Sequence, residues 1–298
     1  VASANCGLYC GASVDFVDID PNTALLSIKK LEEKLQYAKK KGKLPKIVIP
    51  VHFGGQPCDM KEIYALSKKY NFKIIEDAAH AIGAKYQDKL IGSCQYSDIT
   101  VFSFHPVKII TTGEGGVAMT NNLQLSDRMR LLRSHGITRD VSKMKNKPDG
   151  AWYYEQIDLG FNYRMTDIQA ALGISQLNRI EQYVSRRNEI AEWYNKKFRT
   201  TDISPLMQKM GRSSAYHLYV ILIKGGRQQR DVLYNYLLKN DIGVNLHYIP
   251  VYKHPFFNKN SCLENAEYYY KHAISLPIYP TISSKDLNKV VDKILCYI

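Results

Sequence analysis

Apolar residues follow two different spacings in the first half of the chain, and the two spacings alternate. Short continuous apolar runs at 46–51, 72–76, 99–104 and 117–120 predict buried strands. Between the first two runs, Ile63, Leu66 and Tyr70 recur at helical spacing behind Asp59, a residue that can cap a helix. A strand, a helix and a second strand in this order form a βαβ unit. The pattern therefore predicts an α/β protein built on a mostly parallel sheet.

The remaining segments divide into additions to this sheet and a second unit. We expect a strand at 14–18, a helix at 27–40, a hairpin at 85–91, a helix at 123–134 and a polar surface loop at 139–155. A capping box at 166–169 opens another helix. Helices at 185–198, 230–240 and from 285, with a strand at 216–223, predict a smaller α+β domain. The expected division is a large domain at 1–180 and a C-terminal domain at 181–298.

Composition narrows the class of protein. The chain has 298 residues, of which 45% are apolar, which allows a large core. No apolar run reaches the ~18–20 residues of a membrane helix and no basic-then-apolar leader is present, so we expect a soluble cytoplasmic protein without a membrane partner. Six scattered cysteines without a C-x-x-C motif predict reduced thiols and no metal site. A net charge of +13 fits nucleic acid or anionic small molecules, and charge alone leaves both open.

One aspartate and one lysine stand where ligands bind in open α/β sheets. Asp77 follows the strand at 72–76, and Lys108 follows the strand at 99–104 in a Ser-x-x-x-x-Lys run. The amine can form a Schiff base with the aldehyde of pyridoxal 5′-phosphate (PLP), and the carboxylate can keep the ring nitrogen protonated. Taken singly, Lys108 reads as a surface lysine and Asp77 as a loop acid. Their pairing favours the catalytic interpretation.

Other candidates carry weaker signals. Ser103 could bind the cofactor phosphate or bond the backbone, and His80 could pack beside the ring or be an ordinary loop histidine. Asn162 could cap the helix that follows or bind phosphate. The segment 247–252 combines aromatic surface with polar tips, which suits a sugar or uracil face but equally a packed domain junction.

These motifs resemble the sugar aminotransferases of the DegT/DnrJ/EryC1/StrS type, within the fold-type I PLP enzymes. The resemblance rests on Glu-Asp-Ala-Ala-His at 76–80, Ser-Phe-x-x-x-Lys at 103–108 and Glu-Gly-Gly at 114–116, and it spans nearly the whole chain. The runs at 50–58 and 105–108 look most like the branch of the family in pseudaminic acid biosynthesis. The resemblance implies transfer of an amino group from L-glutamate to the C4 keto group of a UDP-linked 2-acetamido-2,6-dideoxy-hexos-4-ulose.

The resemblance also implies a role for each candidate. Lys108 would form the Schiff base, Asp77 would bind the ring nitrogen, and His80 would lie close to the ring. Ser103 would bind the phosphate, and Asn162 would reach the phosphate of the neighbouring subunit's cofactor, which implies a homodimer with shared sites. The residues expected to bind the sugar nucleotide are His247, Tyr248, Val251, Tyr252, Lys253 and His254.

Family members carry a hydroxyl motif that grips the phosphate and an aromatic residue that stacks on the ring, both ahead of the position of Val1. Because neither motif occurs here, we expect that a segment precedes Val1. Within the family, the alternatives are another 4-keto or 3-keto sugar aminotransferase and a PLP-dependent sugar dehydratase, a branch in which His replaces the Schiff-base lysine. Outside it, the alternatives are a basic nucleic-acid-binding module and an inactive fragment.

Overall fold

A computed structural model describes residues 1–257 and 262–297. Its helices are α1 Ala2–Tyr9, α2 Ile28–Lys40, α3 Met60–Tyr70, α4 Leu123–Arg133, α5 Asp167–Leu177, α6 Ile180–Phe198, α7 Gly226–Lys239, α8 Glu264–His272 and α9 Ser284–Leu295. Its strands are β1 Ile47–Val48, β2 Lys73–Asp77, β3 Lys85–Tyr86, β4 Lys89–Leu90, β5 Ile99–Ser103, β6 Gly116–Met119, β7 Ile137–Thr138, β8 Glu155–Gln156, β9 Ile203–Pro205, β10 Arg212–Ser213, β11 Tyr219–Ile223 and β12 Ala273–Leu276. Single 3₁₀ turns are η1 Phe53–Gly55, η2 Val141–Lys143 and η3 Val251–Lys253.

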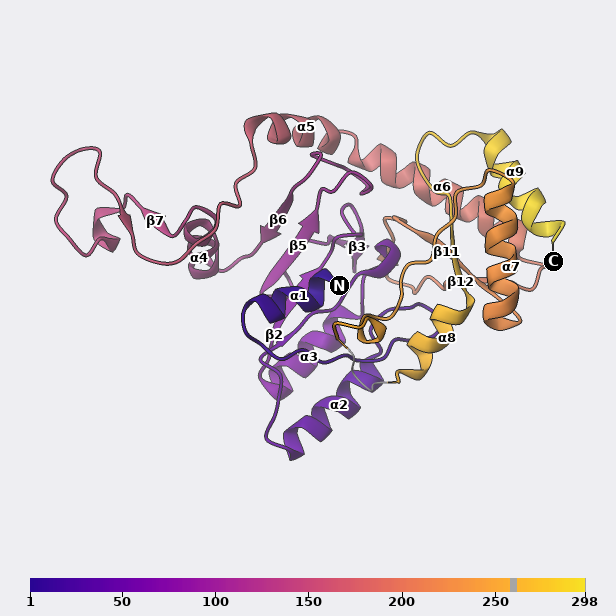
Figure 1. Ribbon diagram of the computed structural model, residues 1–298, viewed down its shortest axis with the longest axis horizontal. Helices are drawn as coiled ribbons and strands as arrows, with labels where there is room; N and C mark the ends of the chain where they lie inside the picture. Colours follow the sequence, from indigo (N-terminus) through magenta and orange to yellow (C-terminus); the bar gives the residue numbers. More distant parts are fainter. Residues whose placement is uncertain (258–261, 298) are drawn as a thin grey trace.

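The predicted α/β sheet is confirmed. Strands lie in the order β1-β2-β5-β6, with β1, β2 and β5 parallel and β6 antiparallel to β5 (Figure 1). Ile74 and Phe102 of this sheet pack on Ile63 and Leu66 of α3 in one buried cluster. In the register, Asp77 stands opposite Val101. The carboxyl ends of β2 and β5 therefore meet at one edge of the sheet.

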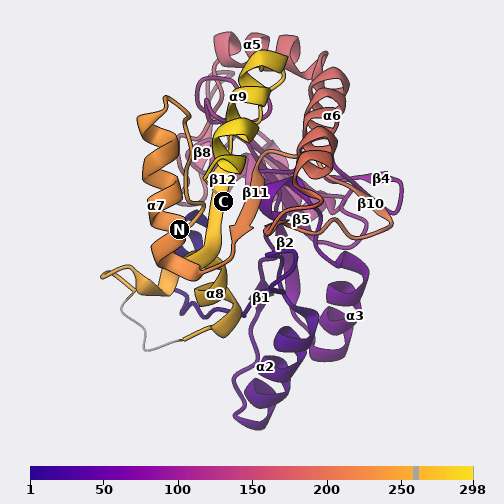
Figure 2. The same ribbon diagram turned by 90° about the vertical axis from the view of Figure 1, so that its right-hand side faces the viewer.

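The C-terminal part forms a second layer of its own. An antiparallel sheet of order β12-β11-β9 is covered by α6, α7 and α9, whose apolar faces share a buried cluster with it (Figure 2). The long helix α6 contributes to both cores, because Ile180 and Val184 pack on the parallel sheet while Ile190 and Phe198 pack on the C-terminal one. The boundary at residue 180 stays a prediction; α6 begins at that residue, after a break at residues 178–179 that separates it from α5.

Two local expectations were wrong. The segment 14–18 does not form a strand: the Phe16 carbonyl accepts a hydrogen bond from the Lys34 ammonium (2.6 Å), and the Asp18 carboxylate accepts from the first amides of α8. Asp59 precedes α3 but makes no capping bond, since its carboxylate pairs with Lys209 (2.6 Å) and Arg212 (2.8 Å). In both cases polar groups that were expected to interact with residues close in sequence instead form hydrogen bonds or ion pairs with residues far away in sequence.

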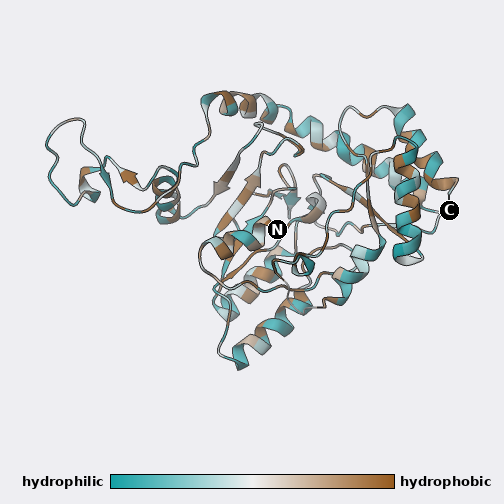
Figure 3. Ribbon diagram, in the orientation of Figure 1, coloured by the Kyte–Doolittle hydropathy of each residue, from teal (hydrophilic) through white to brown (hydrophobic). Residues whose placement is uncertain are grey.

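Residues 121–165 form an arm that extends away from the two sheets and carries α4, β7, η2 and β8 (Figure 1). The chain returns from the arm into α5, which opens with the predicted capping box between Thr166 and Gln169. No residue of α4 or α5 is buried. Much of α5 is nevertheless apolar (Figure 3), and Ile168 and Ile174 are 85% and 64% exposed.

Candidate active site

Asp77 and Lys108 both lie at the carboxyl edge of β2 and β5. Asp77 is the last residue of β2, and its backbone pairs with Val51 on one side and with Val101 of β5 on the other, so its position is fixed. Its Oδ1 accepts a hydrogen bond from the Ala79 amide (3.1 Å) and its Oδ2 accepts one from the Ser3 hydroxyl (2.6 Å). Lys108 lies in the loop 104–115 after β5, where its amide bonds the His105 carbonyl (3.0 Å).

The Lys108 side chain is partly buried, and it lies close enough to Asp77 for the carboxylate charge to affect its pKa. Burial lowers the pKa of Lys108 below the usual lysine value, and the Asp77 carboxylate opposes this shift only in part. A lysine with a lowered pKa has a larger neutral fraction at neutral pH, and the neutral amine is the nucleophile. The structure thus brings together the two residues that the sequence paired.

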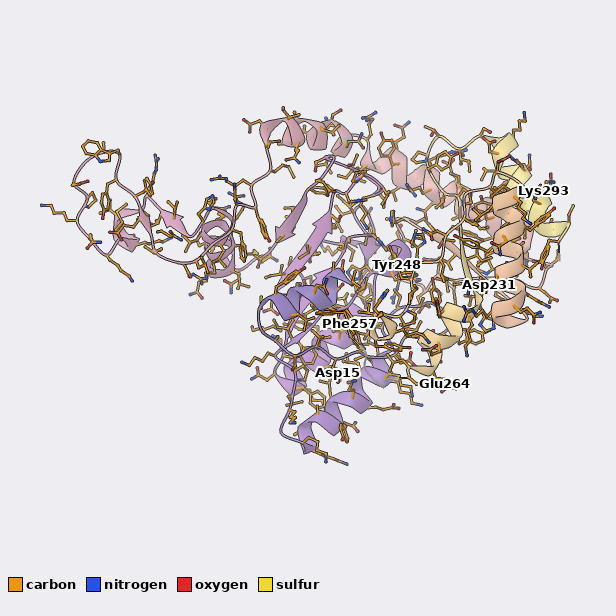
Figure 4. The ribbon with its side chains drawn as sticks, viewed as in Figure 1. Asp15, Asp231, Tyr248, Phe257, Glu264 and Lys293 are labelled. Atoms are coloured by element: carbon orange, nitrogen blue, oxygen red, sulfur yellow. The ribbon has the colours of Figure 1, made fainter. Side chains whose placement is uncertain are left out.

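His80 lies in the same cluster as a neutral imidazole. Burial, reinforced by the nearby Lys108 and His247, lowers the pKa of His80 to about 3. Its Nδ1 accepts a hydrogen bond from the Gly54 amide (3.3 Å), so the ring proton is on Nε2, which faces the Tyr248 hydroxyl at 3.4 Å. Figure 4 labels Tyr248 between the parallel sheet and the C-terminal half. The imidazole is therefore held as a hydrogen-bond donor.

His217, which the sequence did not indicate, completes this cluster. Its ring centroid is 4.4 Å from that of His80, and its Nδ1 is buried with no hydrogen-bond partner among the described residues. Burial, with His80 and Lys108 nearby, lowers the pKa of His217 well below the usual histidine value. A single histidine ahead of an apolar strand carries no local signal, because only the tertiary fold brings it to residues so distant in sequence.

Gly55 allows this close approach. It adopts φ of +103°, and a Cβ there would lie 2.7 Å from the Tyr216 amide nitrogen and 3.0 Å from the His80 carbonyl oxygen. The Gly55 carbonyl also accepts from the Ala215 amide (3.0 Å), and the Gly54 carbonyl accepts from the Leu218 amide (3.2 Å). The glycine pair thus joins the two halves of the chain directly behind His80.

Ser103 ends β5, on the same edge as Asp77. Its hydroxyl accepts a long hydrogen bond from the His105 amide (3.4 Å), which leaves the hydroxyl proton available for a ligand. Next to it, a Cβ on Gly116 would lie 2.6 Å from the Phe102 carbonyl oxygen, and one on Gly115 would lie 2.4 Å from Thr112 Oγ1. The two glycines keep the backbone beside Lys108 tightly folded.

The expected sugar-nucleotide residues separate into two groups. His247, whose Nδ1 is 2.8 Å from the Ser275 hydroxyl, and the half-exposed Tyr248 lie with the His80 cluster. Tyr252 is buried, and its hydroxyl bonds Glu267 (3.0 Å), as does the Lys253 ammonium (2.7 Å). Of the remaining two, Val251 begins η3 and His254 follows it, both partly buried.

Asn162 is not brought to Lys108 within the chain. It is exposed, lies in the arm, and pairs with Ser134 at the end of α4. A role at a cofactor phosphate would therefore require a site in another copy of the chain.

A buried polar network supports the site from behind. The Glu76 carboxylate, next to Asp77, accepts hydrogen bonds from Ser97, Thr100 (2.8 Å) and His52 Nε2 (2.7 Å). The Cys58 amide donates to His52 Nδ1 (3.1 Å), so the ring proton is on Nε2. Burial favours the neutral carboxyl, but the three hydrogen bonds outweigh it and the pKa of Glu76 is lowered. The network fixes β2 just ahead of Asp77.

Within residues 1–257 and 262–297, no three His, Cys, Asp or Glu side chains are grouped so that they could hold a metal ion. Over the same part of the chain, no helix has both the length and the apolar character needed to cross a bilayer. The cytoplasmic location stays a prediction.

Residues 1–295 match the model of the DegT/DnrJ/EryC1/StrS aminotransferase family. The UDP-4-amino-4,6-dideoxy-N-acetyl-beta-L-altrosamine transaminase of Campylobacter jejuni strain 81-176 is 39% identical over 98% of this chain and 75% of its own.

Two solved structures share the fold. Helicobacter pylori PseC, an aminotransferase of pseudaminic acid biosynthesis, matches with a TM-score of 0.89 at 28% identity, over 100% of this chain and 76% of that one. The PLP form of the putative sugar aminotransferase Spr1654 from Streptococcus pneumoniae matches with a TM-score of 0.87 at 27% identity, over 99% and 78%. The chain belongs to the DegT/DnrJ/EryC1/StrS family: it is a sugar aminotransferase with the fold of the PLP-dependent members, and its cofactor is PLP.

Proposed function

We propose that this enzyme transfers the amino group of L-glutamate to the C4 keto group of a UDP-linked 2-acetamido-2,6-dideoxy-hexos-4-ulose. The Campylobacter jejuni relative, named for a UDP-linked 4-amino-4,6-dideoxy sugar, supports the choice of sugar nucleotide. The observation that carries the proposal is the placement of Lys108 beside Asp77 at the carboxyl edge of two parallel strands, with Ser103 at the end of the second.

The residues at this edge fit the cofactor chemically. A carboxylate and a hydroxyl lie at the ends of two adjacent strands, and an amine lies in the loop after the second strand. The carboxylate suits the ring nitrogen of PLP, the amine suits its aldehyde, and the hydroxyl suits its phosphate. In this proposal Asp77 would hold the pyridine nitrogen, Lys108 would bond the aldehyde carbon and Ser103 would bind the phosphate. The buried Nδ1 of His217, unpartnered in the described part of the chain, is consistent with a ligand in this region.

Bound PLP supplies an aldehyde that receives the amino group and a ring that accepts the electron pair released at the substrate carbon. Once the amino donor has displaced it from the aldehyde carbon, Lys108 Nζ would be free to take the proton from the α-carbon of that donor and to pass it on, which is the role of a general base and acid. The lowered pKa of Lys108 keeps a fraction of the amine free to accept that proton. In the second half of the reaction Lys108 moves the proton in the opposite direction.

Tyr248 would bind the sugar at its reacting carbon, while His80 would lie close to the cofactor ring and hold the Tyr248 oxygen. Because Gly54 holds His80 as an Nε2–H donor toward the Tyr248 oxygen, the phenol proton is free to bond a substrate oxygen. Burial, followed by the charge of Asp77, raises the pKa of Tyr248, so the hydroxyl keeps its proton at neutral pH. We assign to it the hydrogen bond to the keto oxygen, with His247 beside it.

The segment 251–254 would border the nucleotide. Since Glu267 holds the Tyr252 hydroxyl and the Lys253 ammonium, we expect Tyr252 to contribute its ring and the segment its backbone rather than these two polar groups. Val251 and His254, partly buried at the two ends of η3, would line the same surface.

We also propose a homodimer with shared sites. Exposed apolar side chains on α5 and an arm that packs on neither sheet are surfaces that a second copy would cover. The arm carries Asn162, which would bind the phosphate in the partner's site. On this basis each site takes residues from two chains.

The decisive experiment adds PLP to the purified full chain, reduces it with borohydride and maps the modified peptide by mass spectrometry. The expected result is one labelled lysine, Lys108, and protection of the label by excess UDP-sugar. Turnover is followed as 2-oxoglutarate formed from L-glutamate and the 4-keto sugar nucleotide. Labelling of a different lysine, or none, would sink the proposal. A labelled Lys108 without turnover would sink only the choice of substrates.

A further inference from the structure

Two donors hold the carboxylate of Asp77, and one of them lies 74 residues away, in the first helix of the chain. The Ser3 hydroxyl, in the first turn of α1, donates to Asp77 Oδ2 at 2.6 Å, whereas the Ala79 amide donates to Oδ1 at 3.1 Å. We propose that Ser3 is a positioning residue, which sets the orientation of the carboxylate that meets the cofactor ring nitrogen. The inference rests on the proposed role of Asp77.

The two hydrogen bonds restrict the carboxylate in complementary ways. Ala79 is two residues from Asp77, so its bond closes a local turn and fixes one oxygen. Ser3 fixes the other oxygen from a separate element, and α1 is itself anchored through buried Ala4. With one donor on each oxygen, the plane of the carboxylate is defined and each oxygen keeps acceptor capacity for a third donor.

Without Ser3, the nearby positive charge would compete for this carboxylate. Lys108 is close enough for the charge of Asp77 to raise its pKa, against the larger effect of burial. A carboxylate held only at Oδ1 can rotate about its Cβ–Cγ bond toward that ammonium. Ser3 therefore keeps the acceptor directed at the ring position and away from the amine.

The Ser3 hydrogen bond also affects the position of the proton between Asp77 and the ring nitrogen of the cofactor. A hydrogen bond donated to a carboxylate favours its charged form, and a charged carboxylate favours the protonated form of a nitrogen beside it. Hydrogen bonds with an ionised partner are roughly twice as strong as neutral ones, and an oxygen–oxygen distance of 2.6 Å fits such a bond. The hydroxyl thus acts on the ring only through Asp77.

The test compares two substitutions of equal shape. Ser3→Thr keeps the hydroxyl, while Ser3→Val replaces it by a methyl group, and both place a β-branched residue in α1. Asn5→Ala is the control for a change elsewhere in α1. The full-length variants are titrated with PLP by fluorescence, and the ¹⁵N chemical shift of the pyridine nitrogen is measured with labelled cofactor.

We expect Ser3→Val to bind PLP ~10-fold more weakly, the effect of one lost hydrogen bond to a charged group. Its ¹⁵N resonance should move toward the unprotonated position, whereas Ser3→Thr and Asn5→Ala should match the wild type within about two-fold. Melting temperatures of Ser3→Thr and Ser3→Val measured without cofactor should agree, which removes folding as a cause.

Equal affinities and equal ¹⁵N shifts for Ser3→Thr and Ser3→Val would overturn the inference. That outcome leaves the proposed function intact, provided that wild-type protein is labelled at Lys108. Failure of the wild type to bind PLP would instead refute the assignment of Asp77 and this inference together.

Discussion

The candidate site has two walls that differ in how the chain completes them. One, the junction wall, consists of Gly54, His80, His217, His247 and Tyr248, and it is mostly buried and closed by hydrogen bonds between the two halves of the chain. The other, the open wall, consists of the loop 104–116 and continues into α5 and the arm, where apolar side chains face solvent. The difference teaches that one chain builds the wall we assign to the sugar, whereas the wall we assign to the phosphate would be completed by the second copy that we propose.

The largest effect is expected on the open wall, at the amine itself. Lys108→Ala should lower kcat by about 10⁴-fold or more, because it removes both the nucleophile and the group that moves the proton. It should also abolish borohydride labelling. Both are measured by 2-oxoglutarate formation and peptide mapping. An unchanged rate with PLP present would show that Lys108 is not the catalytic amine of this site.

A second test removes the proposed neighbour from the open wall. The double variant Ile168→Asp/Ile174→Asp should weaken self-association by about 10³-fold, since a buried charge disrupts an apolar contact. Sedimentation velocity should then show monomers at micromolar concentration, with turnover lost in parallel. Ser175→Asp adds a charge at an exposed polar position of the same helix and should leave the dimer intact. If the wild-type protein is itself monomeric, a second copy does not complete the open wall.

The third test strikes the junction wall. Gly55→Ala should lower the free energy of unfolding by about 3 kcal/mol, the sum of a strained backbone and forced overpacking. Gly42→Ala is the control, because Gly42 also has a positive φ (+65°) but open space around it; it should cost only about 1 kcal/mol. Urea denaturation measures both. Equal losses would mean that the close approach of residues 55, 80 and 216 is not what holds this wall together.

The smallest effect concerns protons in the junction wall. Burial lowers the pKa of His217 far below 6.5, and its neighbours Lys108, Arg187, His80 and His247 add to the shift. The unfolded chain therefore takes up this proton first as pH falls below about 6.5, so folded stability is lost below that pH. From pH 7.5 to 5 the wild type should lose roughly 2 kcal/mol more than His217→Phe, by urea denaturation. Parallel pH curves would show that His217 is not buried as a neutral ring.

Local sequence patterns sufficed for the residues that follow strands. Asp77 and Lys108 could be placed because the carboxyl ends of parallel strands share one edge, and the pattern of apolar runs identified both strands. Thr166 and Gln169 formed their capping box because both partners lie within one turn. Where the interaction is short in sequence, the residue types alone define it.

Contacts between distant residues could not be read in this way. Ser3 lies 74 positions from Asp77, and His217 comes from the far half of the chain. Asp59 looked like a cap, yet the tertiary fold brings Lys209 and Arg212 to it, and two charged partners outcompete a backbone amide. The pairing of such groups is decided by packing, so a serine or a histidine in an unremarkable context can still reach the site.

The seam between Gly54–Gly55 and residues 215–218 constrains how molecules can travel. Backbone bonds from Ala215 and Leu218, together with the Arg212–Asp59 ion pair, fasten the halves at the rear of the catalytic groups. Opening the two halves of the chain at this seam would require all of these hydrogen bonds and the ion pair to break together. We therefore expect substrates to enter and products to leave on the opposite side of the site. Substitutions that speed product release should be sought in residues 104–116 and in the arm.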